Sequence, residues 1–274
     1  MPESQECERR IYRLYGTAPF QVVVLHGGPG AAGEMAPVAQ ALSVRHGVLE
    51  PLLYSLTVES QLDDLERMLA EHATFPVTLI GFSFGAFLGF LYAARRPDHV
   101  KKLVLVSSGP FEESYAGGIF EARMSRLAPG EREEVGTLLE ALSDQGTPDK
   151  DKVFTRFGAL MEKADAFDPA NVTAPACLFS YETFRAVWTE TATLRRSGAL
   201  AETGVRIECP VVVLHGDYDP HPASGVRVPL GKYVKEFRFI SIPRCGHKPW
   251  NEREARDRFF EVLENELTGP ADHR

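Results

Sequence analysis

Residues 77–85 read Val77-Thr78-Leu79-Ile80-Gly81-Phe82-Ser83-Phe84-Gly85, and this stretch decides the fold class. Its first four residues are apolar or β-branched, which is typical of a buried strand. A helical pattern follows from Ala86 to Arg95, with Pro97 beyond its end. A serine between two glycines therefore stands on a sharp turn that leads from a buried strand into a helix.

The same order of strand, turn and helix occurs near the N-terminus. Residues 21–25 form a β-branched run, the Gly/Pro-rich turn 27–33 follows, and a helical stretch ends near Leu42. Further buried strands are expected at residues 103–106, 211–214 and 237–242. Apolar runs that alternate with helices predict an α/β fold, in which helices cover both faces of a mostly parallel sheet.

A different pattern fills the middle of the chain. After Pro110 the strand signal disappears until residue 211, and charged helical stretches broken by Pro and Gly replace it. We therefore predict an α/β core of residues 1–110 and 206–274, with residues 111–205 inserted as a helical cap. The last core helix is expected to begin at Asn251, because Glu254 stands at the spacing of a capping box.

The composition argues against several classes of partner. The 274 residues carry 30 Lys+Arg against 38 Asp+Glu, a formal net charge of −8, which gives no basic field for nucleic acid or anionic lipid. Residues 1–10 are polar and charged, and no window approaches the ~18 apolar residues that a membrane span needs. The cysteines form no C-x-x-C pair; they are Cys7, Cys177, Cys209 and Cys245. We expect a cytoplasmic protein without nucleic-acid or membrane partners.

The turn at Ser83 suggests a nucleophile. A serine held there is forced into strained backbone angles, and Gly81 and Gly85 make room for the turn, so that the hydroxyl stands clear of the sheet. The N–H of Phe84, at the start of the following helix, would point at an oxyanion formed when Ser83 attacks a carbonyl group. The alternative is a Gly-rich turn that carries an unreactive serine.

A serine hydroxyl needs a base to take its proton. His247, in Cys245-Gly246-His247, follows the last predicted strand and lies on a loop, which favours a catalytic histidine over a solvated one. A third member, an acid, would fix the tautomer of the histidine. The loop after the strand 211–214 offers two candidates for it, Asp217 and Asp219.

Together these motifs resemble those of an α/β-hydrolase of the prolyl aminopeptidase-like group. The segment His26-Gly27-Gly28-Pro29-Gly30 is similar to the H-G-G-P-G loop of that group, and Gly216-Asp217-Tyr218-Asp219 is similar to its G-x-x-D acid loop. The resemblance covers essentially the whole chain, and its strongest signals lie at residues 21–107 and 211–250.

The resemblance implies a role for each of these residues. Ser83, Asp219 and His247 stand in the family's chain order of nucleophile, acid and histidine. They would form the triad, with Asp217 shaping the acid loop. The N–H groups of Gly28 and Phe84 would form the oxyanion hole, since Pro29 has no N–H to donate.

The sequence departs from this group in two places. Aminopeptidases of the group carry a D-Q-R-G-x-G segment after the second strand that follows the oxyanion loop, and residues 50–55 lack it. Their nucleophile commonly lies in Gly-Gly-Ser-Trp-Gly, whereas Phe82 and Phe84 flank Ser83 here. An apolar substrate pocket is therefore expected beside Ser83. The predicted substrate contacts are Phe82, Tyr181, Phe184 and Trp188, and packing of the cap against the core is the alternative for the last three.

Two other functions compete with hydrolysis. Residues 28–33 also fit G-x-G-x-x-G after a strand, with Glu50 ending the next apolar stretch, as in the dinucleotide site of an oxidoreductase. The order of Ser83, Asp219 and His247 would then be a coincidence. The second alternative is a protein of the same fold that binds a small molecule with little or no turnover.

The combined motifs predict a serine hydrolase. His247 would deprotonate Ser83, which attacks an ester or amide carbonyl, and water would then release the acyl group. The expected substrate is a small ester, an amide or a short peptide, with N-terminal peptide cleavage included. No metal or organic cofactor is expected. Activity should fall below a pH of about 6.5, the reference pKa of histidine.

Overall fold

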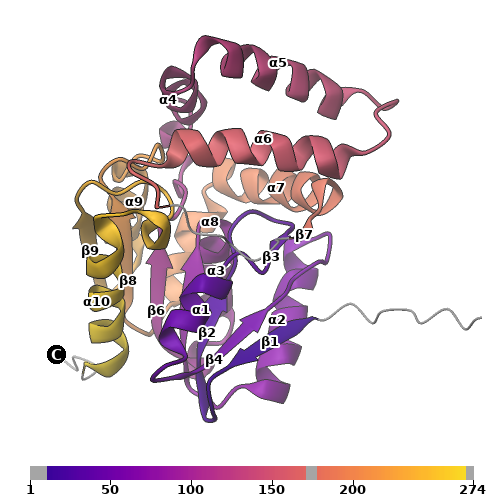
Figure 1. The fold of residues 1–274 in the computed structure, drawn as a ribbon. Coiled ribbons are helices and arrows are strands. Elements are labelled where there is room, and N and C mark those ends of the chain that lie inside the picture. The colour runs from indigo at the N-terminus through magenta and orange to yellow at the C-terminus, as the bar shows by residue number, and fades with distance from the viewer. Residues whose placement is uncertain (1–10, 171–177, 270–274) are drawn as a thin grey trace, which may run out of the picture.

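Seven strands form one sheet in the order β1-β4-β2-β5-β6-β8-β9 (Figure 1). The computed structural model describes residues 11–170 and 178–269, so Cys7 and Cys177 lie outside the described residues. Strand β1 runs antiparallel to β4, and the other neighbours in this sheet are parallel. The strands are β1 (Tyr12–Tyr15), β2 (Phe20–Leu25), β4 (Gly47–Pro51), β5 (Val77–Phe82), β6 (Val100–Val106), β8 (Val211–Gly216) and β9 (Phe237–Ile242). The predicted α/β fold with a mostly parallel sheet is confirmed.

Helices cover both faces of this sheet. On one face lie α1 (Ala36–Leu42) and α10 (Ala255–Thr268). On the other lie α2 (Val58–His72), α3 (Phe84–Arg95), α8 (Ala199–Glu202) and α9 (Ser224–Tyr233). Successive strand residues point to opposite faces. In β2, Val23 and Leu25 therefore pack in the larger core, under α2 and α3, while Val22 and Val24 pack in the smaller core, under α1 and α10. Because both faces are buried in the middle of the sheet, strands β2, β5 and β8 consist mostly of apolar residues.

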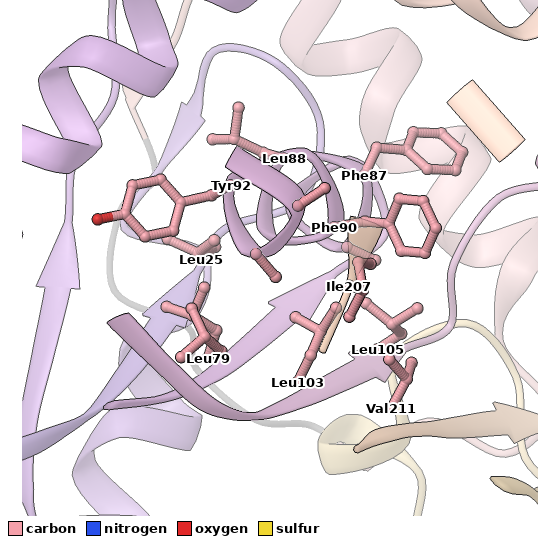
Figure 2. Close-up of a cluster of buried hydrophobic side chains, with 14 of the residues drawn as sticks. Leu25, Leu79, Phe87, Leu88, Phe90, Tyr92, Leu103, Leu105, Ile207 and Val211 are labelled. Atoms are coloured by element: carbon pink, nitrogen blue, oxygen red, sulfur yellow. The ribbon is translucent and has the colours of Figure 1, made fainter. Parts of the chain in front are cut away.

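Helix α3 is packed firmly into the larger core. Figure 2 shows side chains of this helix against side chains of the sheet: Phe87, Leu88, Phe90 and Tyr92 above Leu25, Leu79, Leu103 and Leu105. Phe90 and Tyr92 are fully buried. Burial of one such side chain contributes roughly 1.5–3 kcal/mol. The start of α3, which follows Ser83 directly, is therefore fixed relative to the sheet.

A second layer lies over the carboxyl ends of the strands (Figure 1). It consists of α4 (Ile119–Arg126), α5 (Pro129–Ser143), α6 (Lys150–Asp165) and α7 (Tyr181–Arg196). These helices fall within the stretch predicted as the cap, whose bounds at residues 111 and 205 stay a prediction. The layer also contains a strand that the sequence pattern does not predict, β7 (Leu178–Phe179), which pairs with β3 (Ala31–Ala32) in the loop after β2.

The predicted start of the last helix at Asn251 is wrong. Helix α10 begins at Ala255, and Asn251 belongs to a short 3-10 turn, Pro249–Asn251. The physical reason is Glu252, whose buried carboxylate accepts three main-chain N–H groups. The chain turns inward to make these bonds, so no capping box forms at Asn251.

Strands β1 and β4 and helix α2 are present without having been predicted. Helix α2 has an ordinary start, since the Thr57 side chain accepts the N–H of Ser60. Its buried stripe includes Leu62, Leu65 and Leu69, which pack on the sheet. Across the described ranges, the structure contains no helix both long and apolar enough to span a bilayer.

Candidate active site

Ser83 stands between β5 and α3 in a backbone conformation that few residues adopt. Its φ of 52° and ψ of −112° are disfavoured for an L-residue, so the surrounding packing must hold them. The flanking glycines are required by close approaches. A Cβ at Gly81 would clash with the carbonyl oxygen of Gly85, and a Cβ at Gly85 would clash with that of Leu25. The sharp turn predicted at Ser83 is therefore present.

Three side chains from different loops form a hydrogen-bonded series. Oγ of Ser83 lies 3.1 Å from Nε2 of His247, and Nδ1 of His247 lies 2.8 Å from Oδ2 of Asp219. Their loops follow β5, β9 and β8, and the carboxyl ends of parallel strands meet at one edge of the sheet. The structure thus brings together the three residues that the sequence predicted as a triad.

The second candidate acid, Asp217, is placed differently. It is exposed, and its carboxylate accepts the N–H of Cys245 at 3.3 Å. Its own N–H bonds to the carbonyl oxygen of Ile242 at 3.0 Å. These contacts connect the acid loop to the loop that carries His247, as expected of a loop-shaping carboxylate. Asp219 is the acid that reaches the imidazole.

Burial and charge set the ionisation of the buried pair. Burial of Asp219 opposes its charge, but His247 and His221 beside it outweigh burial, and the pKa of Asp219 is held well below its usual range. Burial lowers the pKa of His247, but the Asp219 carboxylate outweighs this effect, and the pKa of His247 is raised. An ionised Asp219 accepts the Nδ1–H of His247 and leaves Nε2 directed at Ser83.

A second histidine also bonds to Asp219, and the sequence analysis misses it. Oδ1 of Asp219 lies 2.7 Å from Nδ1 of His221 and accepts the main-chain N–H of His221 at 2.9 Å. His221 is buried, and burial lowers its pKa to about 4. The signal was present in Asp219-Pro220-His221, because an Asp side chain often bonds to the main chain two residues further on.

Asp219, His221 and His247 are also the one group, within the described residues, that offers three ligand atoms to a metal ion. These atoms lie within 4.8 Å of one another. The carboxylate is an acceptor and both Nδ1 atoms carry hydrogen toward it, so a metal ion would have to displace both ring protons. The contacts that are present are hydrogen bonds between the two rings and the carboxylate.

The loop after β2 carries Gly28, one of the two predicted oxyanion donors. His26 fixes this loop, with Nδ1 2.8 Å from the carbonyl oxygen of Gly27 and Nε2 accepting the N–H of Leu53 at 3.3 Å. Strands β2 and β5 are neighbours, so the loops of Gly28 and Phe84 leave the sheet side by side. As the first residue of α3, Phe84 has no partner for its N–H inside the helix. Their role as oxyanion donors stays a prediction.

The G-x-G-x-x-G residues are not arranged as in a dinucleotide site. Ala31 and Ala32 form β3, and α1 begins only at Ala36. A dinucleotide site needs the glycine-rich turn to open directly into a helix. Glu50 is fully buried and accepts the hydroxyl of Tyr15 at 2.7 Å, so it does not face a ligand. These placements disfavour the dinucleotide alternative.

Phe82, predicted to contact substrate, is buried beneath the site. Its ring centroid lies 4.9 Å from that of His247 and 4.7 Å from that of Trp250. The ring also explains Gly27, where a Cβ would lie 2.6 Å from it. Phe82 therefore packs against the imidazole of His247 and against the loop of Gly27 from the core side, and substrate contact by Phe82 stays a prediction.

The aromatic side chains of α7 contact other residues of the cap, and Trp188 also packs against the larger core cluster. Phe184 and Trp188 stack with ring centroids 6.0 Å apart, and Phe154 of α6 lies 4.5 Å from Phe184. Tyr181 donates its hydroxyl to the carbonyl oxygen of Leu142 at 3.2 Å. Packing of the cap against the core, the alternative to substrate contact, is present at Trp188. A role of these side chains in substrate binding stays a prediction.

Residues 165–170, which we call the strap, lie across the loop that carries His247. The carbonyl oxygen of Asp165 accepts the N–H of His247 at 3.0 Å. The carboxylate of Glu252 accepts N–H groups at 2.7 to 2.9 Å from Gly246, Phe167 and Asp168. The strap therefore ties the end of α6 to the proposed base.

A cavity of about 280 Å³ opens between the end of α6 and the His247 loop. His247 and Lys248 line it from the core, and Ala159, Ala166 and Pro169 line it from the cap side. Tyr181, Phe184 and Trp188 are not among the described residues that line it. Charged and polar residues also line it, among them Glu162, Lys163 and Asn251, but its exposed surface is mostly apolar and suits an apolar group held close to His247.

Comparison with known proteins identifies the family. A protein-family sequence model, described as alpha/beta hydrolase fold, matches residues 49–249. The chain therefore belongs to the α/β-hydrolase family, and the superfamily inferred from the motifs is confirmed.

Individual relatives support a hydrolase-type activity. The chain is 26% identical over 245 residues to a pimeloyl-[acyl-carrier protein] methyl ester esterase from Chromobacterium violaceum, covering 85% of this chain and 89% of that protein. It is 29% identical over 189 residues to proline iminopeptidase PfmaB of Pestalotiopsis fici, which covers 61% of this chain and 64% of that protein. The crystal structure of VinJ matches with a TM-score of 0.66 at 20% identity over 93% of each chain. The prolyl aminopeptidase-like subgroup is supported only by the iminopeptidase.

Proposed function

We propose that the protein is a serine hydrolase that cleaves an ester or amide bond through an acyl-enzyme on Ser83. The observation that carries the proposal is the series from Ser83 through His247 to Asp219, with contacts of 3.1 and 2.8 Å. It begins on a strained turn at the carboxyl edge of the sheet. A buried acid bonded to Nδ1 leaves Nε2 able to accept the serine proton.

In the proposed reaction, His247 takes the proton of Ser83 as Oγ attacks the carbonyl carbon. The N–H groups of Gly28 and Phe84 would hold the oxyanion. The imidazolium then gives its proton to the leaving alcohol or amine, and the acyl group stays on Oγ. Water, deprotonated by His247, attacks the acyl-enzyme, which releases the acid and restores Ser83. The side chains and N–H groups named here supply each step without a metal or organic cofactor.

A small ester is the substrate that we favour over an amide or a short peptide. The esterase match covers 89% of that relative, whereas the iminopeptidase match covers 64%. We propose that residues 111–205 act as a cap over the site. The cavity beside His247 would take an apolar leaving group, because His247 delivers the proton to that group. A cytoplasmic location stays a prediction from the sequence.

A fluorophosphonate probe tests the proposal, because it reacts with activated serine hydroxyl groups. We expect a covalent adduct on Ser83 and none in Ser83→Ala. Ser107 is a matched control, since it also has a positive φ, of 47°, and directly follows the neighbouring strand β6, as Ser83 follows β5. Ser107→Ala should label like the wild type. An unlabelled Ser83 would contradict the proposal and favour a binding protein of the same fold.

Hydrolysis assays then rank the substrate classes. We expect short-chain nitrophenyl esters to be cleaved faster than lactones and proline anilides. Faster cleavage of proline anilides would move the proposal from an esterase to an aminopeptidase with the same nucleophile.

A further inference from the structure

The carboxylate of Asp219 faces two histidines, and the reaction proposed above uses one of them. Oδ2 bonds to Nδ1 of His247 at 2.8 Å, and Oδ1 bonds to Nδ1 and the main-chain N–H of His221 at 2.7 and 2.9 Å. The two ring centroids lie 4.5 Å apart. One buried carboxylate thus holds two imidazoles side by side, and His247 is the one within hydrogen-bond distance of Ser83.

The Asp219 carboxylate determines which nitrogen of each histidine ring carries hydrogen. An ionised Asp219 accepts hydrogen bonds only, so both Nδ1 atoms carry hydrogen. Burial and the nearby His247 lower the pKa of His221 to about 4 against the charge of Asp219. The pKa of His247 is raised, because Asp219 outweighs burial there. His221 is therefore neutral at the pH where His247 exchanges its proton.

Two hydrogen bonds fix the main chain of His221. Nε2 of His215, at the end of β8, lies 2.9 Å from the carbonyl oxygen of His221. The N–H of His221 turns back to Asp219 across Pro220. Both histidines are buried. The main chain of His221 is thus anchored on two sides, which directs its ring at Oδ1 of Asp219.

We propose that His221 is a positioning residue, whose neutral ring N–H holds Oδ1 of Asp219 so that Oδ2 stays aligned with His247. The inference rests on the serine hydrolase proposed above. A donor on Oδ1 also draws on the charge of the carboxylate and limits how strongly Asp219 stabilises the imidazolium of His247. Loss of the donor should therefore have two effects: a less fixed Asp219 lowers the rate, and the charge no longer shared with His221 makes His247 hold its proton more tightly, which we expect to be the larger effect on its pKa.

Other charged or titratable groups also face the two rings. Arg123 of α4 acts on both rings, and Asp165 of α6 acts on that of His247. Two further groups lie beside the pair: Nε2 of His215 is 3.9 Å from Oδ2 of Asp219, and Lys248, next to His247 in the chain, pairs with Glu34. Arg123 is paired with Asp165 at 2.7 Å, and Lys248 with Glu34 at 2.9 Å. These pairs form without the ring of His221, so they stay in place when that ring is replaced. A change in the proton affinity of His247 would then report on Asp219.

Two substitutions separate the ring N–H from the ring itself. His221→Phe keeps a ring and the main-chain N–H but removes the donor, whereas His221→Asn places an amide N–H where Nδ1 stood. With a nitrophenyl ester, His221→Phe should lower kcat by about 10-fold, as expected when a catalytic group is misplaced. The pH at which kcat/KM falls on acidification should rise by roughly half a unit to one unit. His221→Asn should restore most of the rate and the wild-type pH dependence.

Titration of the His247 ring by NMR, in a Ser83→Ala background, measures the same shift without turnover. An upward shift in His221→Phe that is absent in His221→Asn would support the proposal. An unchanged pKa of His247 in both variants would overturn it, and so would a loss of rate without a shift, which indicates a merely structural residue. If the wild type hydrolyses nothing, the proposed function fails, and the titration still decides the role of His221.

Discussion

The carboxyl edge of the sheet and the cap are stabilised in different ways. At the edge, loops leave strands of fixed register, and single atoms of Ser83, His247 and Asp219 meet at 3.1 and 2.8 Å. In the cap, α5 and α6 share a small apolar cluster and exposed ion pairs such as Arg156 with Glu134 at 2.6 Å. An exposed pair contributes about 0–1 kcal/mol. Substitutions at the edge should therefore cost much more than those in the cap.

Two of the attachments between the regions lie on loops of the proposed site. The strap bonds to the loop of His247. On the other side β7 pairs with β3, and the N–H of Ser180 donates to the carbonyl oxygen of Gly30 at 3.0 Å, in the loop of Gly28. Other attachments lie away from the site, such as the carboxylate of Glu190 in α7, which accepts the N–H of Val58 at 2.8 Å. The weaker region is thus attached in part at the loops where the geometry of the stronger region matters most.

The largest effect is expected at the edge, from Asp219→Asn. The amide can donate toward Nδ1 and so favours the wrong tautomer of His247, which should lower kcat on the order of 10³- to 10⁴-fold. Asp217→Asn makes the same change in the same loop and should keep most of the activity. Steady-state ester hydrolysis measures both, with circular dichroism as the check of folding. Equal losses in the two variants would remove the distinction between these acids.

The next largest effect is expected in the pH dependence of the activity at this edge. The base must be neutral, and the pKa of His247 is raised by Asp219. The decline in kcat/KM on acidification should therefore begin above a pH of about 6.5, the reference value, and reach about tenfold per pH unit below the raised pKa. A rate profile of kcat/KM measures this limb. A flat profile from about pH 5 to 8 would be incompatible with His247 as the base.

A smaller effect is expected where the regions meet, from Glu252→Gln. The new amide N–H₂ would face a main-chain N–H in a buried site, which should lower the free energy of unfolding by roughly 1–3 kcal/mol. Scanning calorimetry should show a lower Tm by several degrees. Glu254→Gln is the matched control, because Glu254 pairs with Arg244 at the surface. If the two variants melt alike, the strap does not depend on the Glu252 carboxylate.

The edge was predictable because each of its parts is local in sequence. Ser83 lies directly between a strand pattern and a helix pattern, and the loops of Asp219 and His247 each follow an apolar run. The order of the parallel strands then brings these loops together. His221 was missed because the family's triad assigns no role to a second histidine, although Asp219-Pro220-His221 carried a local signal for the contact.

The attachment of the cap was not predictable, since it depends on contacts between distant residues. Glu252 binds Phe167, which lies 85 positions earlier, and the local pattern at Asn251 and Glu254 favours a capping box instead. Helical periodicity likewise predicts the cap helices without showing which aromatic faces meet, as Phe154 and Phe184 do. Packing between elements decides these features, and it leaves only a weak trace in the local sequence.

The smallest expected effect compares one added methyl group in the two regions. Gly158 lies inside α6, and a Cβ added there would meet nothing within 4 Å, so Gly158→Ala should stabilise the helix by about 0.5–1 kcal/mol. At Gly246 the added Cβ would clash with the carbonyl oxygen of Asp165, so Gly246→Ala must displace the strap and lower the Tm. Calorimetry of both variants should give shifts of opposite sign. If Gly158→Ala lowered the Tm as much as Gly246→Ala, the cap would be packed as tightly as the edge, and the contrast between the two regions would not hold.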